Sequence, residues 1–274
     1  MQPSFAGLRH QSVIPSVIEA VGRGWYTLRR LLVMVKGLLF DFGGTLDGPT
    51  HWLDRFLAQY RAAGIEIERA ELDPAFDHAT KTGYGATKIV SRFGLTDLIR
   101  FLVGHQMEFL RANGPERIRT MIEGADGKGR HRMVEQVTSS FVTETKAGMA
   151  DSRRALDSLG NKFAMGVVSN FYGNLETILE DGAIRNYFSA IADSSRVKIF
   201  KPEPGIFQAA LKSLRLSPAD AAMIGDSLDK DCKPAHQLGM RTVWYQPHPN
   251  GIADRDAIVD FTIASLEGLN RIAW

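Results

Sequence analysis

The sequence predicts an α/β fold: a doubly wound parallel sheet (a Rossmann-like core) with an inserted α-helical cap domain. Two observations support this prediction. Short apolar runs, which suit strands buried on both faces, alternate with helical stretches in the second half of the chain. Residues 48–150 instead show helical periodicity, and they follow the first apolar run directly.

The apolar runs give the expected strands and the segments between them give helices. Strands are expected at residues 37–40, 163–168, 221–224 and 242–245, with two further candidates at 188–191 and 261–263. Between the later runs, apolar residues recur at helical spacing from 206 to 214, after Pro204, which suits a first helical turn. A second helix at 235–238 is expected to end at Gly239.

The inserted tract is expected to be a helical cap. Trp52, Phe56 and Tyr60 share one helix face, between Pro49 and Gly64. Further helices are expected at 89–93, 98–109 and 133–143, with a loop at 124–129. An insertion after the first strand overhangs the carboxyl ends of the strands, where open α/β sheets bind ligands.

Composition limits the class of protein. The chain has 274 residues, 44% hydrophobic and 23% charged, as is typical of soluble globular proteins. No apolar run approaches the roughly 20 residues that span a bilayer. Cys232 is the single cysteine, which excludes an internal disulfide and favours a reducing compartment. We therefore expect a cytoplasmic protein with no membrane partner.

The basic residues are unevenly distributed. Residues 1–33 carry four Arg and one Glu, a net charge of +3, so the remainder carries +2 − 3 = −1. A basic groove across the body is therefore not expected, and nucleic acid is not an expected partner. We interpret residues 1–33 as an N-terminal extension, either a disordered tail or a mis-assigned start, with a targeting peptide as the third alternative. The core then comprises 34–47 and 151–274, and the cap 48–150.

Polar residues stand at the ends of the expected strands. Asp41 follows the first strand, Ser169-Asn170 the second, and Asp226 a later one, with Asp231 five residues on. Lys201 precedes Pro202 before a helix. Each residue alone has an ordinary explanation as a turn, a helix cap or a solvated lysine. Because the ends of parallel strands meet at one edge of a sheet, we expect them to converge.

These stretches resemble the haloacid dehalogenase-like (HAD) hydrolase superfamily over roughly residues 35–265. The resemblance is carried by DFGGTL (41–46), VVSN (167–170), FKPEPGIF (200–207), MIGDSLDKD (223–231) and GMRTVWY (239–245). It implies a Mg²⁺-dependent phosphatase, a monomer or homodimer, that acts on a small phosphorylated metabolite through an aspartyl-phosphate. This chemistry is reasonable because a carboxylate can attack phosphorus once cations neutralise the mutual charge.

The resemblance also implies roles for individual residues. Asp41 would be the nucleophile, with Ser169 and Lys201 as the other catalytic residues. Ser169, Asn170, Lys201 and Gly44 would bind the substrate. The ligands of Mg²⁺ would be Asp41, the carbonyl of Gly43, and Asp226, supported by Asp231.

Gly43 departs from the family pattern, which usually has a second aspartate there as general acid and base. Such help is worth about 10²–10⁴-fold in rate. Replacement groups are Asp47, His51, Lys81 or Tyr84. One alternative function is a phosphonoacetaldehyde-type hydrolase that breaks a C–P bond through a Schiff base on Lys81. Another is a non-catalytic member that binds a phosphorylated ligand or a protein. The dehalogenase branch is disfavoured because Asp226 retains the metal carboxylate.

Overall fold

The computed structural model describes residues 34–247 and 257–274. The expected extension, residues 1–33, lies outside the described residues. The predicted sheet is confirmed: six parallel strands lie in the order β3-β2-β1-β4-β5-β6. The strands are β1 Gly37–Phe40, β2 Ala164–Ser169, β3 Ala190–Asp193, β4 Ala221–Gly225, β5 Arg241–Tyr245 and β6 Phe261–Ile263. The doubly wound α/β class predicted from the sequence is thus correct.

Each face of the sheet is covered by its own apolar cluster, because side chains alternate along a strand. Leu39 and Met223 pack on one face against α10 (Pro204–Leu214) and α11 (Lys233–Gln237). Leu38, Phe40 and Ile224 point to the other face, whose cluster includes residues of α7 (Gly127–Leu159) and α8 (Leu175–Asp181). Both faces of the central strands are therefore buried, as the continuous apolar runs predicted.

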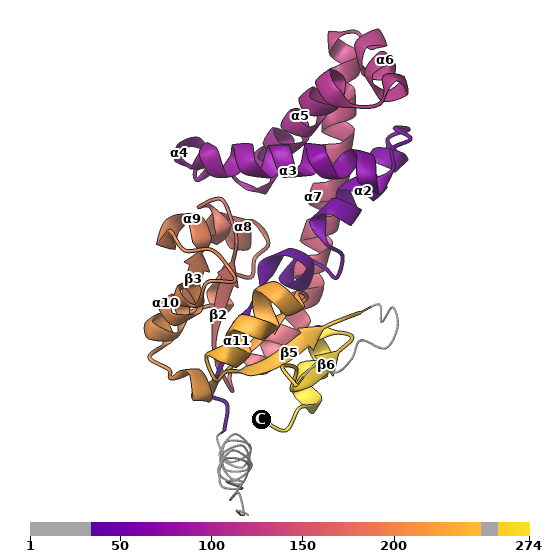
Figure 1. The fold of residues 1–274 in the computed structure, drawn as a ribbon. Coiled ribbons are helices and arrows are strands. Elements are labelled where there is room, and N and C mark those ends of the chain that lie inside the picture. The colour runs from indigo at the N-terminus through magenta and orange to yellow at the C-terminus, as the bar shows by residue number, and fades with distance from the viewer. Residues whose placement is uncertain (1–33, 248–256) are drawn as a thin grey trace, which may run out of the picture. The chain divides into compact units, whose positions relative to one another are not determined.

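Helices α2 to α7 form a helical insertion between β1 and β2 (Figure 1). They are α2 Trp52–Ala62, α3 Arg69–Gly85, α4 Thr87–Val90, α5 Leu95–Asn113, α6 Glu116–Gly124 and α7. A short helix, α9 (Ser194–Val197), follows β3 in the core. Figure 1 shows α7 running from the insertion to the sheet. In the described part of the chain, no helix is both long and apolar enough to cross a bilayer.

Some element boundaries predicted from the sequence were wrong. A loop was expected at 124–129, but only two residues separate α6 from α7. The Asp126 side chain accepts the Gly129 N–H (2.6 Å) and caps α7, so this helix begins early. That helix then continues without a break past residue 150, so the expected boundary between cap and core falls inside a helix. The third strand begins at Ala190, two residues later than predicted.

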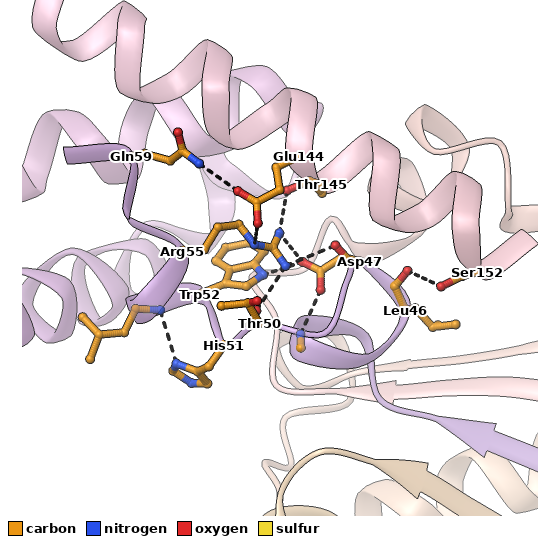
Figure 2. Close-up of polar contacts among 12 residues, drawn as sticks. Leu46, Asp47, Thr50, His51, Trp52, Arg55, Gln59, Glu144, Thr145 and Ser152 are labelled. Carbon is orange, nitrogen blue, oxygen red and sulfur yellow. Dashed lines mark hydrogen bonds and ion pairs between the residues drawn. The ribbon is translucent and has the colours of Figure 1, made fainter. Parts of the chain in front are cut away.

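A buried ion pair joins the insertion to the turn after β1 (Figure 2). Arg55, on α2, is 1% exposed, and its Nη1 lies 3.2 Å from Asp47 Oδ2. The same nitrogen donates to Thr145 Oγ1 on α7 (2.9 Å), while Nη2 donates to the Asp47 carbonyl (3.1 Å). Trp52 Nε1 also donates to Asp47 Oδ2 (2.5 Å). One carboxylate and one guanidinium therefore hold α2, α7 and the turn together.

Helix α7 touches this turn directly. Ser152 Oγ donates to the Leu46 carbonyl (2.7 Å). One turn earlier, a Cβ at Gly148 would meet the Asp47 carbonyl oxygen at 2.2 Å, so only glycine lets the helix pass so close. Both contacts fix where the insertion leaves and re-enters the core.

We expect Asp47→Ala to destabilise the protein by about 3 kcal/mol or more, because it removes the buried carboxylate of Arg55 and leaves only the partly exposed Glu144, whose Oε1 lies 3.5 Å from Arg55 Nε. Urea denaturation at neutral pH measures this change in the free energy of unfolding. Asp77→Ala is the matched control: Asp77 pairs with Lys81 on the exposed surface of α3, and its loss should cost less than about 1 kcal/mol. Equal small losses in both variants would contradict a structural role for the buried pair.

Candidate active site

The carboxylate of Asp41 faces a buried lysine from a distant part of the chain. Phe40 pairs with Val167 of β2 on one side and with Ile224 of β4 on the other, so Asp41 lies level with both neighbouring strand ends. Lys201 Nζ lies 2.7 Å from Asp41 Oδ1 and 2.7 Å from Asp231 Oδ1. The lysine side chain is 3% exposed, so the ammonium is buried between the two carboxylates.

The ammonium remains charged despite its burial. Burial lowers the pKa of Lys201, but Asp231 and Asp41 outweigh it, and the pKa lies above its ordinary value. A second contact orients Asp231, because its Oδ2 accepts the Ser227 N–H (3.1 Å). The lysine is therefore a fixed positive charge in contact with Asp41.

A third carboxylate, Asp226, completes an acidic cluster. Single oxygens of Asp41, Asp226 and Asp231 lie within 4.8 Å of one another. Burial, and then repulsion from Asp41 and Asp231, raises the pKa of Asp226 above its ordinary value. Burial likewise raises the pKa of Asp231, although Lys201 counteracts it. One ammonium does not balance three carboxylates, so this donor set fits a divalent cation that prefers oxygen ligands.

Asn170 holds the lysine segment in place. Its side-chain amide donates to the Lys201 carbonyl (3.0 Å), and its side-chain oxygen accepts the Lys201 N–H (2.7 Å). These two bonds position Lys201, and the assignment of Asn170 to substrate binding stays a prediction. Ser169, which ends β2, lines the cavity beside it.

Gly44 lies in the turn after β1, and its backbone N–H donates to Asp47 Oδ1 (2.8 Å). Two observations explain why this residue is glycine. Its φ is +81°, and a Cβ there would meet Asp226 Oδ2 at 2.5 Å. Gly44 therefore makes room for the acidic cluster, and its expected contact with substrate stays a prediction.

The proposed replacements for a missing acid separate into two groups. Asp47 is fully buried in the joint with Arg55, and Lys81 is exposed and pairs with Asp77 Oδ2 (2.6 Å). Neither is among the described residues that line the cavity. His51 and Tyr84 do line it. The His51 Nδ1 accepts the Leu53 N–H (3.2 Å), and burial raises the pKa of Tyr84, so neither side chain is arranged as a strong acid.

The cavity above the carboxylates also contains residues that sequence reasoning missed. Its volume is about 500 Å³. The aromatic side chains that line it, besides Tyr84, are Trp52, Phe76, Phe171, Tyr172 and Phe200. Phe171 and Tyr172 directly follow Ser169-Asn170, and Phe200 directly precedes Lys201, so adjacency to the motifs was a usable signal. Phe76 lies in the middle of α3 and gave no such signal.

Comparisons with known proteins identify the family and the fold. A family model described as haloacid dehalogenase-like hydrolase matches residues 35–239. Haloacid dehalogenase-like hydrolase domain-containing protein 3 of Bos taurus is 30% identical over 82% of this chain and 88% of its own length. Glyceraldehyde 3-phosphate phosphatase of Methanocaldococcus jannaschii is 34% identical over 86% and 96%. A dehalogenase crystal structure with an intermediate complex has a TM-score of 0.58 at 16% identity, covering 87% of this chain and 96% of its own. That last likeness concerns the fold alone.

We expect the metal-free protein to lose stability as the pH rises above the ordinary range of aspartate. The folded state raises the pKa of Asp226 and Asp231, so it retains protons that the unfolded chain has already released. This contribution to stability disappears as the buried carboxyls ionise. A divalent cation such as Mg²⁺ should therefore raise the unfolding temperature more at about pH 8 than at about pH 5.

Thermal denaturation in EDTA and in Mg²⁺ measures both effects. Asp226→Asn removes one carboxylate, so it should flatten the pH dependence and weaken the Mg²⁺ effect. Asp77→Asn, on the exposed surface of α3, is the control and should behave as the unmodified protein. An Mg²⁺ effect of the same size in both variants would contradict a cation site at these carboxylates.

Proposed function

Because the chain belongs to the haloacid dehalogenase-like hydrolase family, we propose that it is a Mg²⁺-dependent phosphatase that acts on a small phosphorylated metabolite. The observation that carries the proposal is the buried contact of Lys201 with Asp41 and Asp231 beside Asp226. The relative that is a glyceraldehyde 3-phosphate phosphatase supports the same reaction class.

Asp41 is the nucleophile in this proposal. An oxygen of its carboxylate attacks phosphorus, the bond from phosphorus to the leaving oxygen breaks, and an aspartyl-phosphate forms. Water then attacks phosphorus, which releases inorganic phosphate and restores the carboxylate. Lys201 offsets the charge of Asp41 and holds a phosphoryl oxygen, and Ser169 donates to another.

The carboxylates suit Mg²⁺, which favours one or two carboxylates together with carbonyl, water and phosphate oxygens. Asp41, Asp226 and the Gly43 carbonyl would hold it, with Asp231 in support. When bound, the cation supplies positive charge to the transferring phosphoryl group. The helical insertion serves as the cap, because its residues line the cavity opposite the carboxylates.

The alternatives have less support. A C–P bond hydrolase would need a lysine of the insertion in the cavity, whereas Lys81 is exposed and paired with Asp77. A non-catalytic binder would not need a buried lysine in contact with the nucleophilic carboxylate. A phosphatase accounts for both the lysine and the acidic cluster.

Hydrolysis of p-nitrophenyl phosphate is the direct test. We expect turnover with Mg²⁺, none in EDTA, and a loss of about 10³-fold or more in Asp41→Asn, because the amide is not a nucleophile. Asp77→Asn should keep full activity. Full activity in Asp41→Asn would overturn the assignment of the nucleophile. Melting shifts on adding phosphate esters, without any turnover, would instead identify a binding protein.

A further inference from the structure

The cavity has two chemically different walls. The polar wall consists chiefly of Asp41, Ser169 and Asp226 at the strand ends and of Lys201 from the segment before α10. The aromatic wall consists of Trp52, Phe76 and Tyr84 from the insertion and Phe171, Tyr172 and Phe200 from the core. A phosphate ester bound with its phosphorus at Asp41 would place its remaining part against the aromatic wall.

Five of the six rings of the aromatic wall are packed against one another, and the sixth, Phe76, packs against Phe56. The ring centroids of Tyr84 and Tyr172 are 4.8 Å apart, and those of Tyr84 and Phe200 are 5.2 Å apart. On the other side, Trp52 packs edge-on against Phe171 at 5.9 Å. Tyr172 and Phe171 are only 4% and 3% exposed. The wall is thus preorganised, and an aromatic group at its surface would pair favourably with such rings.

Positive charge is scarce around the part of the cavity that would receive the leaving group. Of the described residues of the insertion that line it, none is Lys or Arg. Lys201 is already in contact with two carboxylates, and Lys230, from the exposed segment after β4, is the one other lysine among the described residues that line the cavity. A second anionic group on the substrate would depend on Lys230 alone to offset its lost hydration, whereas an uncharged leaving group needs no such partner.

Gly43 adds an independent constraint on the leaving group. Its backbone, at φ −73° and ψ 120°, is open to any residue. A Cβ there would meet only the Trp52 ring, at 3.5 Å, which is ordinary contact. Glycine is therefore not required by conformation or space, and the site simply lacks an acid at this position. Trp52 Nε1–H, the nearest donor, is already bonded to Asp47.

A leaving group that receives no proton must be stable as an anion. A phenol has a pKa near 10, as tyrosine does, whereas an aliphatic alcohol is far less acidic. We infer that the site hydrolyses phosphate monoesters of phenolic hydroxyls in preference to those of aliphatic alcohols. This inference rests on the proposed function and deepens it.

The reaction balances without an acid in the site. The bond from Asp41 oxygen to phosphorus forms while the bond from phosphorus to the aryl oxygen breaks, and the phenolate departs with that electron pair. It takes a proton from water outside the site. A second water then attacks phosphorus, and Asp41 leaves as a carboxylate. The products are the phenol and inorganic phosphate.

Four phosphate compounds separate ring binding from leaving-group acidity. Phenyl and benzyl phosphates both contain a ring, but the leaving group of the first is an acidic phenol and that of the second is an alcohol. Acetyl phosphate has an acidic leaving group and no ring. Ethyl phosphate has an alcohol leaving group and no ring. With Mg²⁺, we expect kcat/KM for phenyl phosphate to exceed kcat/KM for benzyl phosphate by about 10²-fold or more, the range of missing acid catalysis, because kcat/KM reports the step in which the leaving group departs and not the shared hydrolysis of the aspartyl-phosphate. We expect KM to be lower for the two ring compounds than for ethyl phosphate.

Gly43→Asp tests the leaving-group argument directly. The variant restores an acid beside the cavity, so it should raise kcat/KM for benzyl and ethyl phosphates by about tenfold or more and change kcat/KM for phenyl phosphate far less. Gly43→Asn, which fits the same space without an acid, is the matched control and should not raise kcat/KM for either. An unmodified protein that hydrolyses benzyl and phenyl phosphates with the same kcat/KM would overturn the argument.

Phe76→Ala tests the aromatic wall. It should raise KM for phenyl phosphate by about threefold to tenfold and leave KM for acetyl phosphate unchanged, because only the first has a ring to pack. Phe109→Ala is the matched control, since Phe109 packs against His78 elsewhere in the insertion. Equal effects on both substrates would contradict a ring-binding wall.

The outcomes distinguish this inference from the proposed function. If no compound shows hydrolysis that depends on Mg²⁺ and Asp41, the phosphatase itself is wrong, and the inference fails with it. If phosphoserine or ethyl phosphate has a higher kcat/KM than phenyl phosphate, the phosphatase stands and the substrate class is overturned. A higher kcat/KM for phenyl phosphate, lowered by Phe76→Ala, supports both.

Discussion

The buried contact of Lys201 with Asp41 and Asp231 is the constraint on which the site depends. Three carboxylates cannot share one edge of a sheet unless positive charge accompanies them. Several local features serve this arrangement. The Asn170 side chain binds both the backbone N–H and the backbone carbonyl of Lys201. At Gly225, a Cβ would meet Asp231 Oδ2 at 2.3 Å, so this glycine, like Gly44, leaves room for a carboxylate.

The joint at Asp47 connects that charged edge to the aromatic wall. Trp52 belongs to both: its Nε1 donates to Asp47, and its ring lines the cavity and packs against Phe171. Burial raises the pKa of Asp47, while Arg55 and Trp52 counteract this. Any shift of α2 would therefore disturb a buried ion pair and move an aromatic wall residue together. Figure 2 shows how closely the turn, α2 and α7 meet here.

The strands and the convergence of the motifs were predictable, because a parallel sheet brings its strand ends together whatever lies between them. Contacts that depend on loop geometry were not. Nothing in the sequence indicates that the Asn170 amide binds the Lys201 backbone, or that the Gly44 amide donates to Asp47. The loop expected at 124–129 was wrong because one cap at Asp126 outweighs the low helix propensity of two glycines. Phe76 reaches the cavity only through the packing of α3.

Gly43 and the aromatic wall are separate features, but one kind of substrate explains both. A phenolic hydroxyl is acidic because its charge spreads into a ring, and the same ring is what an aromatic wall binds. A small polar substrate would leave as an alkoxide, which needs an acid to protonate it, and its hydroxyl and carboxyl groups would not pack against the aromatic rings. The two features would then need separate explanations. The missing aspartate is therefore better understood as part of the specificity of this site than as damage to a general phosphatase.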